Sequence, residues 1–326
     1  MEIEFLVQTL SSLVAAASPV VLASIGETVS EKSGVINLSL DGSIALSAMT
    51  GFAVALTTGS VWLAMVAAMA VGALMALVVA FASITLRLEQ VAVGFVLAML
   101  GLELADFLGN PFVRRPGPSV PHWPIPYLAE VPILGPIFFD QNLVVYLSFL
   151  AVVVSWWWIY KTQPGLKLQG VGERPESAFA RGVNVNRLRY VYTVVGGALV
   201  GLAGASYSLS IKLGWSHRHT FGIGWIALAI VIFGGWNPWR VAAGSYLFGL
   251  LKALGSILQR NPAFANVPTQ IFSSAPFALM IFALLLVSSE GVDRLLALLP
   301  PRVARRIDRT IRGRLPGWLG RPFVQE

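Results

Sequence analysis

Polar side chains interrupt the apolar pattern of residues 26–42, GETVSEKSGVINLSLDG. Asn37 is the most informative of them, because an amide side chain both donates and accepts hydrogen bonds to a polar ligand. Irregular backbone at membrane depth is tolerated only where protein buries it or water reaches it, and transporters place substrate sites in such broken segments. The alternative is an ordinary turn in water whose charged residues include Glu31 and Lys32. The candidate substrate contacts of this segment are Glu27, Ser33, Asn37, Ser39 and Asp41.

Glu103, His217 and His219 are further residues whose side chains can ionise or bind metal. Glu103 lies within an apolar run, where an ionisable residue is costly and often functional, unless it sits near the aqueous end or pairs within the bundle. His217 and His219 have no acid or Cys close to them in sequence, so we predict no metal site there. No GxxxxGK[ST] motif occurs, so any ATP that drives the protein binds to another chain, and we predict no catalytic residue and no cofactor.

The stretch Gly165–Arg189 is the longest polar interruption in the second half of the chain. With Lys161 it carries six basic residues and only two acids, which predicts a cytoplasmic location. Pro175 is suited to the first turn of a helix, and Gly182 can end that helix in a left-handed conformation. We therefore expect a short helix near 175–182 outside the membrane, the alternative being a solvated loop with helical character.

Composition places these segments in a membrane protein. Of 326 residues 56% are hydrophobic and 12% charged, against about 25% charged in soluble domains. The net charge of +7 is a topological signal, because 14 of the 23 basic residues lie at 161–189 and in the tail after Gly291. We therefore expect no nucleic-acid partner. The absence of Cys excludes disulfides and thiolate metal sites.

Apolar runs predict an all-α, polytopic protein of about nine transmembrane segments with the N-terminus outside. If residues 35–40 dip into the membrane, the number becomes eight to ten and the side of the N-terminus stays open. The single permease-like domain would cover 1–293, followed by an Arg-rich cytoplasmic tail at 294–326. Prolines make 110–141 an irregular external loop, and the pair Gly197 and Gly201 predicts close helix packing. The predicted spans are 5–25, 43–58, 61–85, 91–108, 143–160, 190–209, 240–258 and 275–289, with a shorter run at 221–233.

Three motifs resemble the inner-membrane permeases of ABC importers for nucleosides and simple sugars. Residues 26–42 resemble the family pattern GE…SERSGVINIGLEG, and VGERPESAFARGVNV at 171–185 resembles its VGENPxAAxxAGI element. Residues 226–249 resemble its IALAAVIFGNWNP region, and residues 124–146 are similar to the second permease of nucleoside systems. Two departures are visible, because Arg174 replaces the usual Asn and Asp41 replaces Glu.

The resemblance implies three partners: a cytoplasmic ABC ATPase, a second permease that forms a heterodimer with this one, and an extracellular substrate-binding lipoprotein. It implies that this subunit lies in the lipid of the bacterial cytoplasmic membrane. It also implies that the element at 171–185 contacts the ATPase. The positions carried over for this contact are Gly172, Glu173, Arg174, Pro175, Ala178 and Gly182.

These observations predict a permease for a neutral nucleoside, because a buried unpaired charge is expensive and hydrogen-bonding side chains dominate the candidate path. Asn237 is a further candidate for this path, and Trp236 offers a ring on which a base can stack, although interfacial anchoring is typical of Trp. A simple-sugar importer is the alternative, and a passive channel is a weaker one, because a channel has no use for the helix near 175–182.

Overall fold

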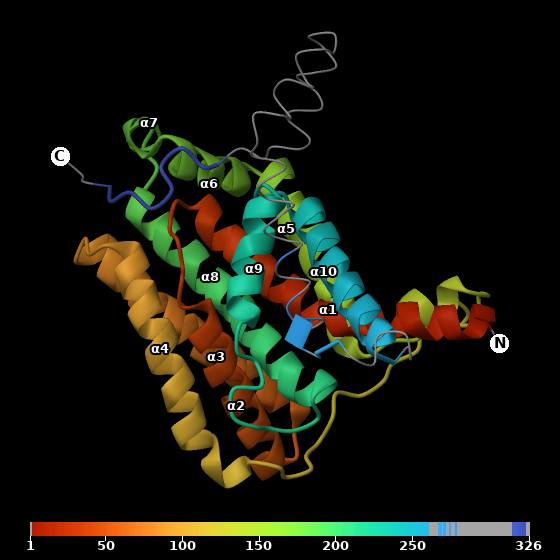
Figure 1. Ribbon diagram of the computed structural model, residues 1–326. Coiled ribbons are helices and arrows are strands. Elements are labelled where there is room, and N and C mark those ends of the chain that lie inside the picture. Colours follow the sequence, from red (N-terminus) through yellow and green to blue (C-terminus); the bar gives the residue numbers. More distant parts are fainter. Residues whose placement is uncertain are drawn as a thin grey trace.

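The computed structural model describes residues 2–260, 267–268, 270–271, 274, 278 and 315–323. Within them the chain is helical, with short 3₁₀ and π-helical segments and irregular connections (Figure 1). The α-helices are α1 (Glu2–Lys32), α2 (Leu40–Thr58), α3 (Val61–Ala80), α4 (Gln90–Gly109), α5 (Leu143–Lys161), α6 (Gln163–Glu173), α7 (Pro175–Ala180), α8 (Val185–Ser206), α9 (Ile223–Phe233) and α10 (Pro238–Arg260). The predicted all-α fold is confirmed. Apart from Ala278, the predicted span at 275–289 and the tail region 294–314 lie outside the described residues.

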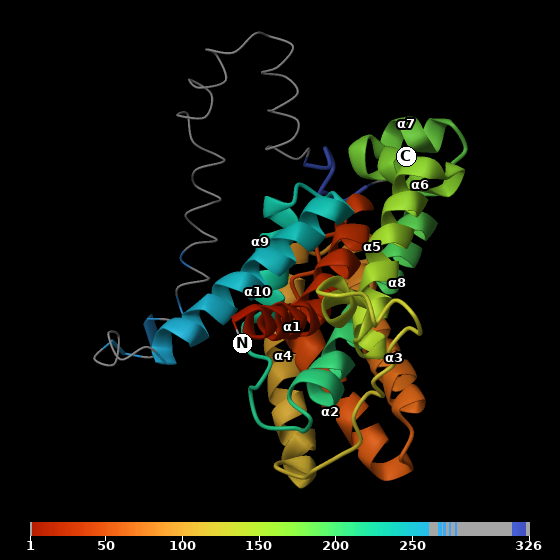
Figure 2. The same ribbon diagram turned by 90° about the vertical axis from the view of Figure 1, so that its right-hand side faces the viewer.

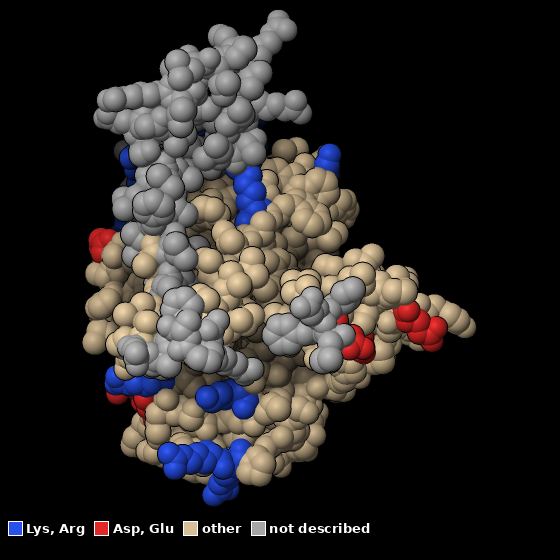
Figure 3. Space-filling model, turned by 45° about the vertical axis from the view of Figure 1, so that its right-hand side comes forward, with Lys and Arg blue, Asp and Glu red and all other residues tan. Residues whose placement is uncertain are grey.

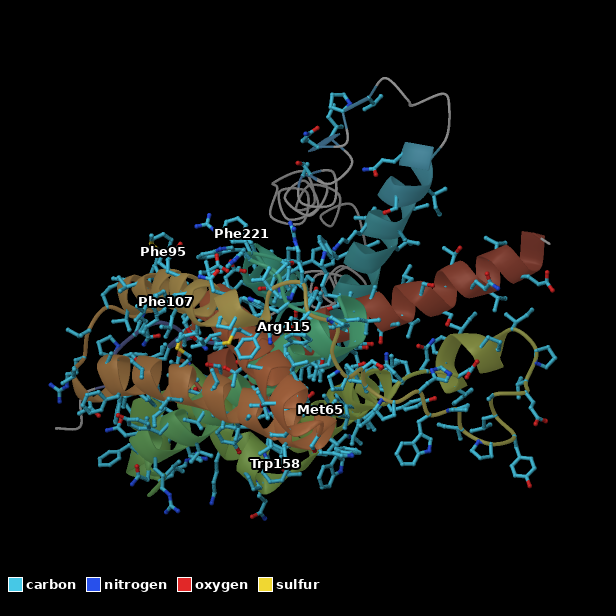
Figure 4. All side chains as sticks on the ribbon, turned by 90° about the horizontal axis from the view of Figure 1, so that it is seen from below. Met65, Phe95, Phe107, Arg115, Trp158 and Phe221 are labelled. Atoms are coloured by element: carbon cyan, nitrogen blue, oxygen red, sulfur yellow. The ribbon has the colours of Figure 1, made fainter. Side chains whose placement is uncertain are left out.

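Seven helices of the described part are long and apolar enough to cross a membrane, and α9 is a shorter apolar helix. Their outward faces are apolar: Figure 3 shows one side of the molecule that is mostly uncharged. Figure 4 places Phe95 and Phe107 of α4 on one side of the bundle and Trp158 of α5 on the other, and all three rings are exposed. Apolar side chains that face outward in this way suit contact with lipid.

Glycines set the packing at the centre of the bundle, where α8 lies against α1 and α3. A Cβ at Gly72 of α3 would overlap the backbone of Gly197 and Gly201, and a Cβ at Gly26 of α1 would overlap the carbonyl of Gly196. Without side chains at these points the helix backbones touch directly. The predicted close packing through Gly197 and Gly201 is confirmed.

The polar segment at 26–42 is only partly broken. Residues 26–32 continue α1, and the irregular part is 33–39, which we call the chain break. The helix ends at Lys32, and Gly34 follows it with a left-handed φ of +89°, which favours glycine. Expecting irregular backbone over all of 26–42 was therefore too broad, because partners from distant parts of the chain bury the polar side chains of α1 and allow the helix to continue.

Two helices occupy the stretch predicted to contain one. Thr162 caps α6 by accepting a hydrogen bond from the Gly165 N–H at 3.2 Å, and Pro164 lies in the first turn. After one extended residue, Pro175 starts α7. Gly182 follows α7 with a φ of +80°, which confirms its predicted left-handed conformation. Both helices lie at one end of the bundle (Figures 1 and 2).

The Pro-rich connection at 110–141 leaves the end of α4 that is distant from α6 and α7 (Figure 1). It contains a 3₁₀ segment (Asn110–Phe112) and a π-helical segment (Gly135–Phe139), with irregular backbone between them. The prediction of an irregular loop is confirmed. Its location outside the cell stays a prediction.

Candidate functional site

The side chains of Glu27, Asn37 and Gln90 accept hydrogen bonds from backbone N–H groups of the chain break. Glu27 accepts from the Asn37 N–H at 2.9 Å, and Asn37 Oδ1 accepts from both the N–H and the hydroxyl of Ser39, at 3.2 and 2.6 Å. Gln90 of α4 accepts from the Ile36 N–H at 2.8 Å. Buried N–H groups need such partners, so these side chains satisfy an irregular segment that has no helix or sheet ladder.

The short helix α9 begins at the side chain of Asp41. The two carboxylate oxygens accept from the N–H groups of Gly222 and Gly224, at 3.1 and 2.8 Å. Asp41 itself lies in the first turn of α2, so the N-termini of two helices meet around one buried carboxylate. Helix N-termini favour negative charge, and here Asp41 supplies it. A Cβ at Gly224 would overlap the Asp41 backbone, which explains the glycine.

The other end of α9 meets α1. The indole N–H of Trp236 donates to the buried carboxylate of Glu31. Trp236 is only 5% exposed, so the expected interfacial anchoring is wrong. Asn237 is half-buried and accepts from the Trp239 N–H at 3.1 Å, which places it at the start of α10. Its neighbour Trp236 contacts Glu31, in the last turn of α1 before the chain break.

Hydrogen bonds join three predicted residues, Glu27, Asn37 and Ser39, within the bundle, whereas Asp41, also buried, bonds to the start of α9. Ser33 is also buried, and its hydroxyl donates to the Ser30 carbonyl at the end of α1. Sequence reasoning missed Gln90 and gave Glu31 no functional role. Their contacts span up to 205 positions of sequence, so only the folded chain reveals them.

Glu103 lies apart from this group. Its carboxylate is 2.9 Å from the Arg218 guanidinium, and its side chain is 68% exposed. Asp106, one turn further along α4, lies 3.6 Å from Arg218 and 3.4 Å from His217. Burial lowers the pKa of the adjoining His219. These residues form an ion-paired surface at the end of α4 and do not line the chain break.

The helix pair α6 and α7 presents a groove on the surface. Pro175 and Ala178 are buried beneath it, whereas Glu173 and Arg174 are exposed. The residues that line the groove are Leu166, Lys167, Gly170, Glu173, Arg174, Ser177, Ala178, Arg181 and Val183. An open groove with exposed side chains of both charges suits contact with another protein.

The groove and the chain break are physically joined at Gly172. A Cβ at this position would overlap the Lys32 carbonyl and lie close to the Gly34 N–H, so the last turn of α6 rests on the end of α1. The motifs at 26–42 and 171–185 are therefore in direct backbone contact. Movement of α6 must move the start of the chain break, or Gly172 must separate from it.

Comparison with known proteins identifies relatives over most of the chain. Residues 9–285 match the family model described as "Branched-chain amino acid transport system / permease component". A putative glucose ABC transporter permease protein of Haloferax volcanii is 40% identical over 249 residues, 75% of this chain and 76% of the relative. A guanosine ABC transporter permease protein of Bacillus subtilis is 35% identical over 297 residues, 86% of this chain and 92% of the relative. A nucleoside ABC transporter permease protein of Lactococcus lactis subsp. cremoris is 31% identical over 287 residues, 85% of this chain and 90% of the relative.

Proposed function

The chain belongs to the branched-chain amino acid transport system permease family of ABC importers, and from this premise we propose that the solute it carries is a nucleoside. As such a permease it is a multi-pass protein of the cytoplasmic membrane and not itself an enzyme. It works with an ATPase and a binding protein on other chains. Its class of solute is a nucleoside or a sugar.

The main support for a nucleoside is the extent of the match to the guanosine permease. That likeness covers 92% of the relative, and the nucleoside permease is covered to 90%. The chemistry of the chain break supports it, because Asn37 and Ser39 offer neutral hydrogen-bonding groups to a neutral solute with hydroxyls and ring nitrogens.

A neutral sugar is the second candidate, because the putative glucose permease has the higher identity, 40%. The two are separated by uptake into proteoliposomes that contain the complete importer with its binding protein. We expect labelled guanosine to enter in an ATP-dependent manner, and excess unlabelled glucose to leave that uptake unchanged. Uptake of labelled glucose without uptake of guanosine would establish the sugar instead. Calorimetric titration of the binding protein with both compounds gives an independent readout.

The proposed path runs beside the chain break. In the described residues Glu27, Asn37, Ser39 and Asp41 are turned inward and engaged with backbone, so a solute reaches them only after the segment opens. When the segment opens, hydrogen bonds within the protein are replaced by hydrogen bonds to the solute, which limits the free-energy cost of opening. Asn237 would border this path at its edge, on the connection to α10.

The proposed driving contact is α7 in a groove of the ATPase. ATP-dependent movement of α7 would pass through α6 and Gly172 to the end of α1, and so to the chain break. A second permease would complete the membrane channel as the partner in a heterodimer. In Lactococcus lactis a second nucleoside permease protein also resembles part of this chain, which supports such a pair.

A further inference from the structure

The C-terminal segment, residues 315–323 (LPGWLGRPF), packs onto the helices assigned to coupling. In Figure 1 it passes across α6 and below α7 to the adjoining end of α8. Its turns are formed by hydrogen bonds from the Leu319 N–H to the Pro316 carbonyl and from the Arg321 N–H to the Trp318 carbonyl, at 3.1 and 3.3 Å. Gly320 has a φ of +75° that permits the second turn.

Backbone hydrogen bonds connect this segment to both parts of the proposed mechanism. The Trp318 N–H donates to the Gly172 carbonyl at 2.9 Å, at the last turn of α6. Two residues later, the Gly320 N–H donates to the Gly34 carbonyl at 3.1 Å, at the start of the chain break. The segment thus bridges the two elements that Gly172 already brings into contact, and it supplies donors to carbonyls at helix ends.

Its last described residue fills the space between α7 and α8. Phe323 is 7% exposed and packs in one apolar cluster with Val171, Ala178 and Val185. Its ring centroid lies 6.0 Å from that of Phe179. Because α7 has only six residues, it cannot hold its position by helix propensity, and burial against Phe323 is a main source of its anchorage.

A buried cation also depends on the segment. Arg189 of α8 is 1% exposed, and its Nη1 donates to the Arg321 carbonyl at 3.2 Å. Its Nε and Nη2 have no hydrogen-bond partner among the described residues. A buried guanidinium with few hydrogen-bond partners costs free energy. Loss of the Arg321 carbonyl would remove the hydrogen bond that Arg189 Nη1 makes and raise this cost.

We propose that residues 315–323 are a positioning element that fixes α6 and α7 relative to the chain break and so makes the importer couple ATP hydrolysis to uptake. This inference rests on the proposed coupling role of α7. It assigns a function to the end of the C-terminal tail, which neither the family model, ending at residue 285, nor composition explains. Phe323 holds α7 by apolar packing, and the backbone of residues 318–320 connects α6 to the chain break by hydrogen bonds.

The test uses the complete importer with Phe323→Ala, and with Leu315→Ala as the matched control. Leu315 is an apolar residue of the same segment, but it is 59% exposed. A nitroxide on Ser177→Cys, an exposed position of α7 in a chain without Cys, reports the mobility of this helix. Labelled guanosine uptake and ATP hydrolysis are measured in the same preparations, and Phe323→Leu tests rescue by an apolar side chain.

We expect Phe323→Ala to mobilise the spin label and to lower guanosine moved per ATP hydrolysed by roughly five-fold or more, a typical coupling effect. Leu315→Ala should leave both unchanged, and Phe323→Leu should restore most of each. An unchanged spectrum overturns the inference, and so does a mobilised label with an unchanged transport ratio. Faster coupled uptake would also overturn it, because the segment would then restrain α7. If the wild type takes up no guanosine, the solute assignment fails, whereas the mobility result still decides the anchorage.

Discussion

Asn37 hydrogen-bonds within the chain break, and it is also the residue proposed to contact the solute. Its Oδ1 accepts two hydrogen bonds from Ser39 in the structure, while its residue type was predicted to contact the solute. The sequence indicated that a polar residue here was significant. It could not reveal that the hydrogen-bond partner of Asn37 is Ser39, because alternating apolar and polar residues do not determine where each side chain points in an irregular segment.

We predict that Asn37→Leu lowers uptake severalfold or more. The substitution leaves the buried Ser39 N–H unpaired, at about 1–3 kcal/mol, whereas the Ser39 hydroxyl keeps the Ser43 hydroxyl at 3.1 Å. It also removes the proposed contact to the solute. Uptake by the reconstituted importer is the measurement, with Leu38→Met as a control in the same segment. The binding protein's affinity should not change, since it is a separate chain. Normal uptake by a fully expressed Asn37→Leu protein would place the path elsewhere.

At the scale of elements, α9 illustrates a helix whose position is fixed by one carboxylate. Its apolar sequence, IGWIALAIVIF, predicted a run too short for a full crossing, and that is what the structure contains. The capping of α9 by Asp41 could not be predicted, because 181 and 183 positions separate Asp41 from Gly222 and Gly224. For the same reason the glycines at 222 and 224 had no explanation in the sequence.

We therefore predict that Asp41→Leu destabilises the subunit by on the order of 3 kcal/mol, because two buried N–H donors lose a charged acceptor. Asp41→Asn, which keeps one oxygen acceptor, should cost less. Thermal unfolding of the detergent-purified protein is the measurement, and the melting temperatures should fall in the order wild type, Asn, Leu. Equal melting temperatures for all three would contradict the capping role.

The helix α6 was missed for a different reason. Its sequence, QPGLKLQGVGE, has three glycines and lacks a strong apolar stripe, so it resembles a polar loop. Tertiary contact overrides this weak propensity, since Leu168 and Val171 are fully buried and Gly165 and Gly172 rest on backbone. In contrast, Pro175 and Gly182 marked the ends of α7 correctly, because both residues act through local backbone geometry.

At the scale of the whole molecule, the two stretches predicted to be cytoplasmic meet at one end. The C-terminal segment contacts α6 and α7, so the tail and the 165–189 stretch lie on the same side in the described part. The position of seven spans along the chain followed from hydropathy alone, since each matches a long apolar helix of the described residues. The arrangement of the spans did not, because it depends on which glycine meets which helix, as Gly72 meets α8.

Sidedness is testable with single cysteines, since the chain has none. Ser177 on α7 and Ser119 in the Pro-rich loop are both exposed in the structure. A membrane-impermeant maleimide added to intact cells should label Ser119→Cys, and it should label Ser177→Cys only after the cells are opened. Labelling of Ser177→Cys from outside in intact cells would reverse the assigned topology.

We propose that α6 and α7 contact the ATPase and act on the chain break through the backbone contact at Gly172. The most direct measurement compares Gly172→Ala with Gly170→Ala, two identical changes within one turn of α6. A Cβ at Gly172 overlaps the Lys32 carbonyl, whereas a Cβ at Gly170 meets only Ala178, at 4.0 Å. In the reconstituted importer we expect Gly172→Ala to lower guanosine uptake per ATP hydrolysed, and Gly170→Ala to match the wild type. Equal transport ratios for the two variants, with both proteins assembled, would contradict the claim.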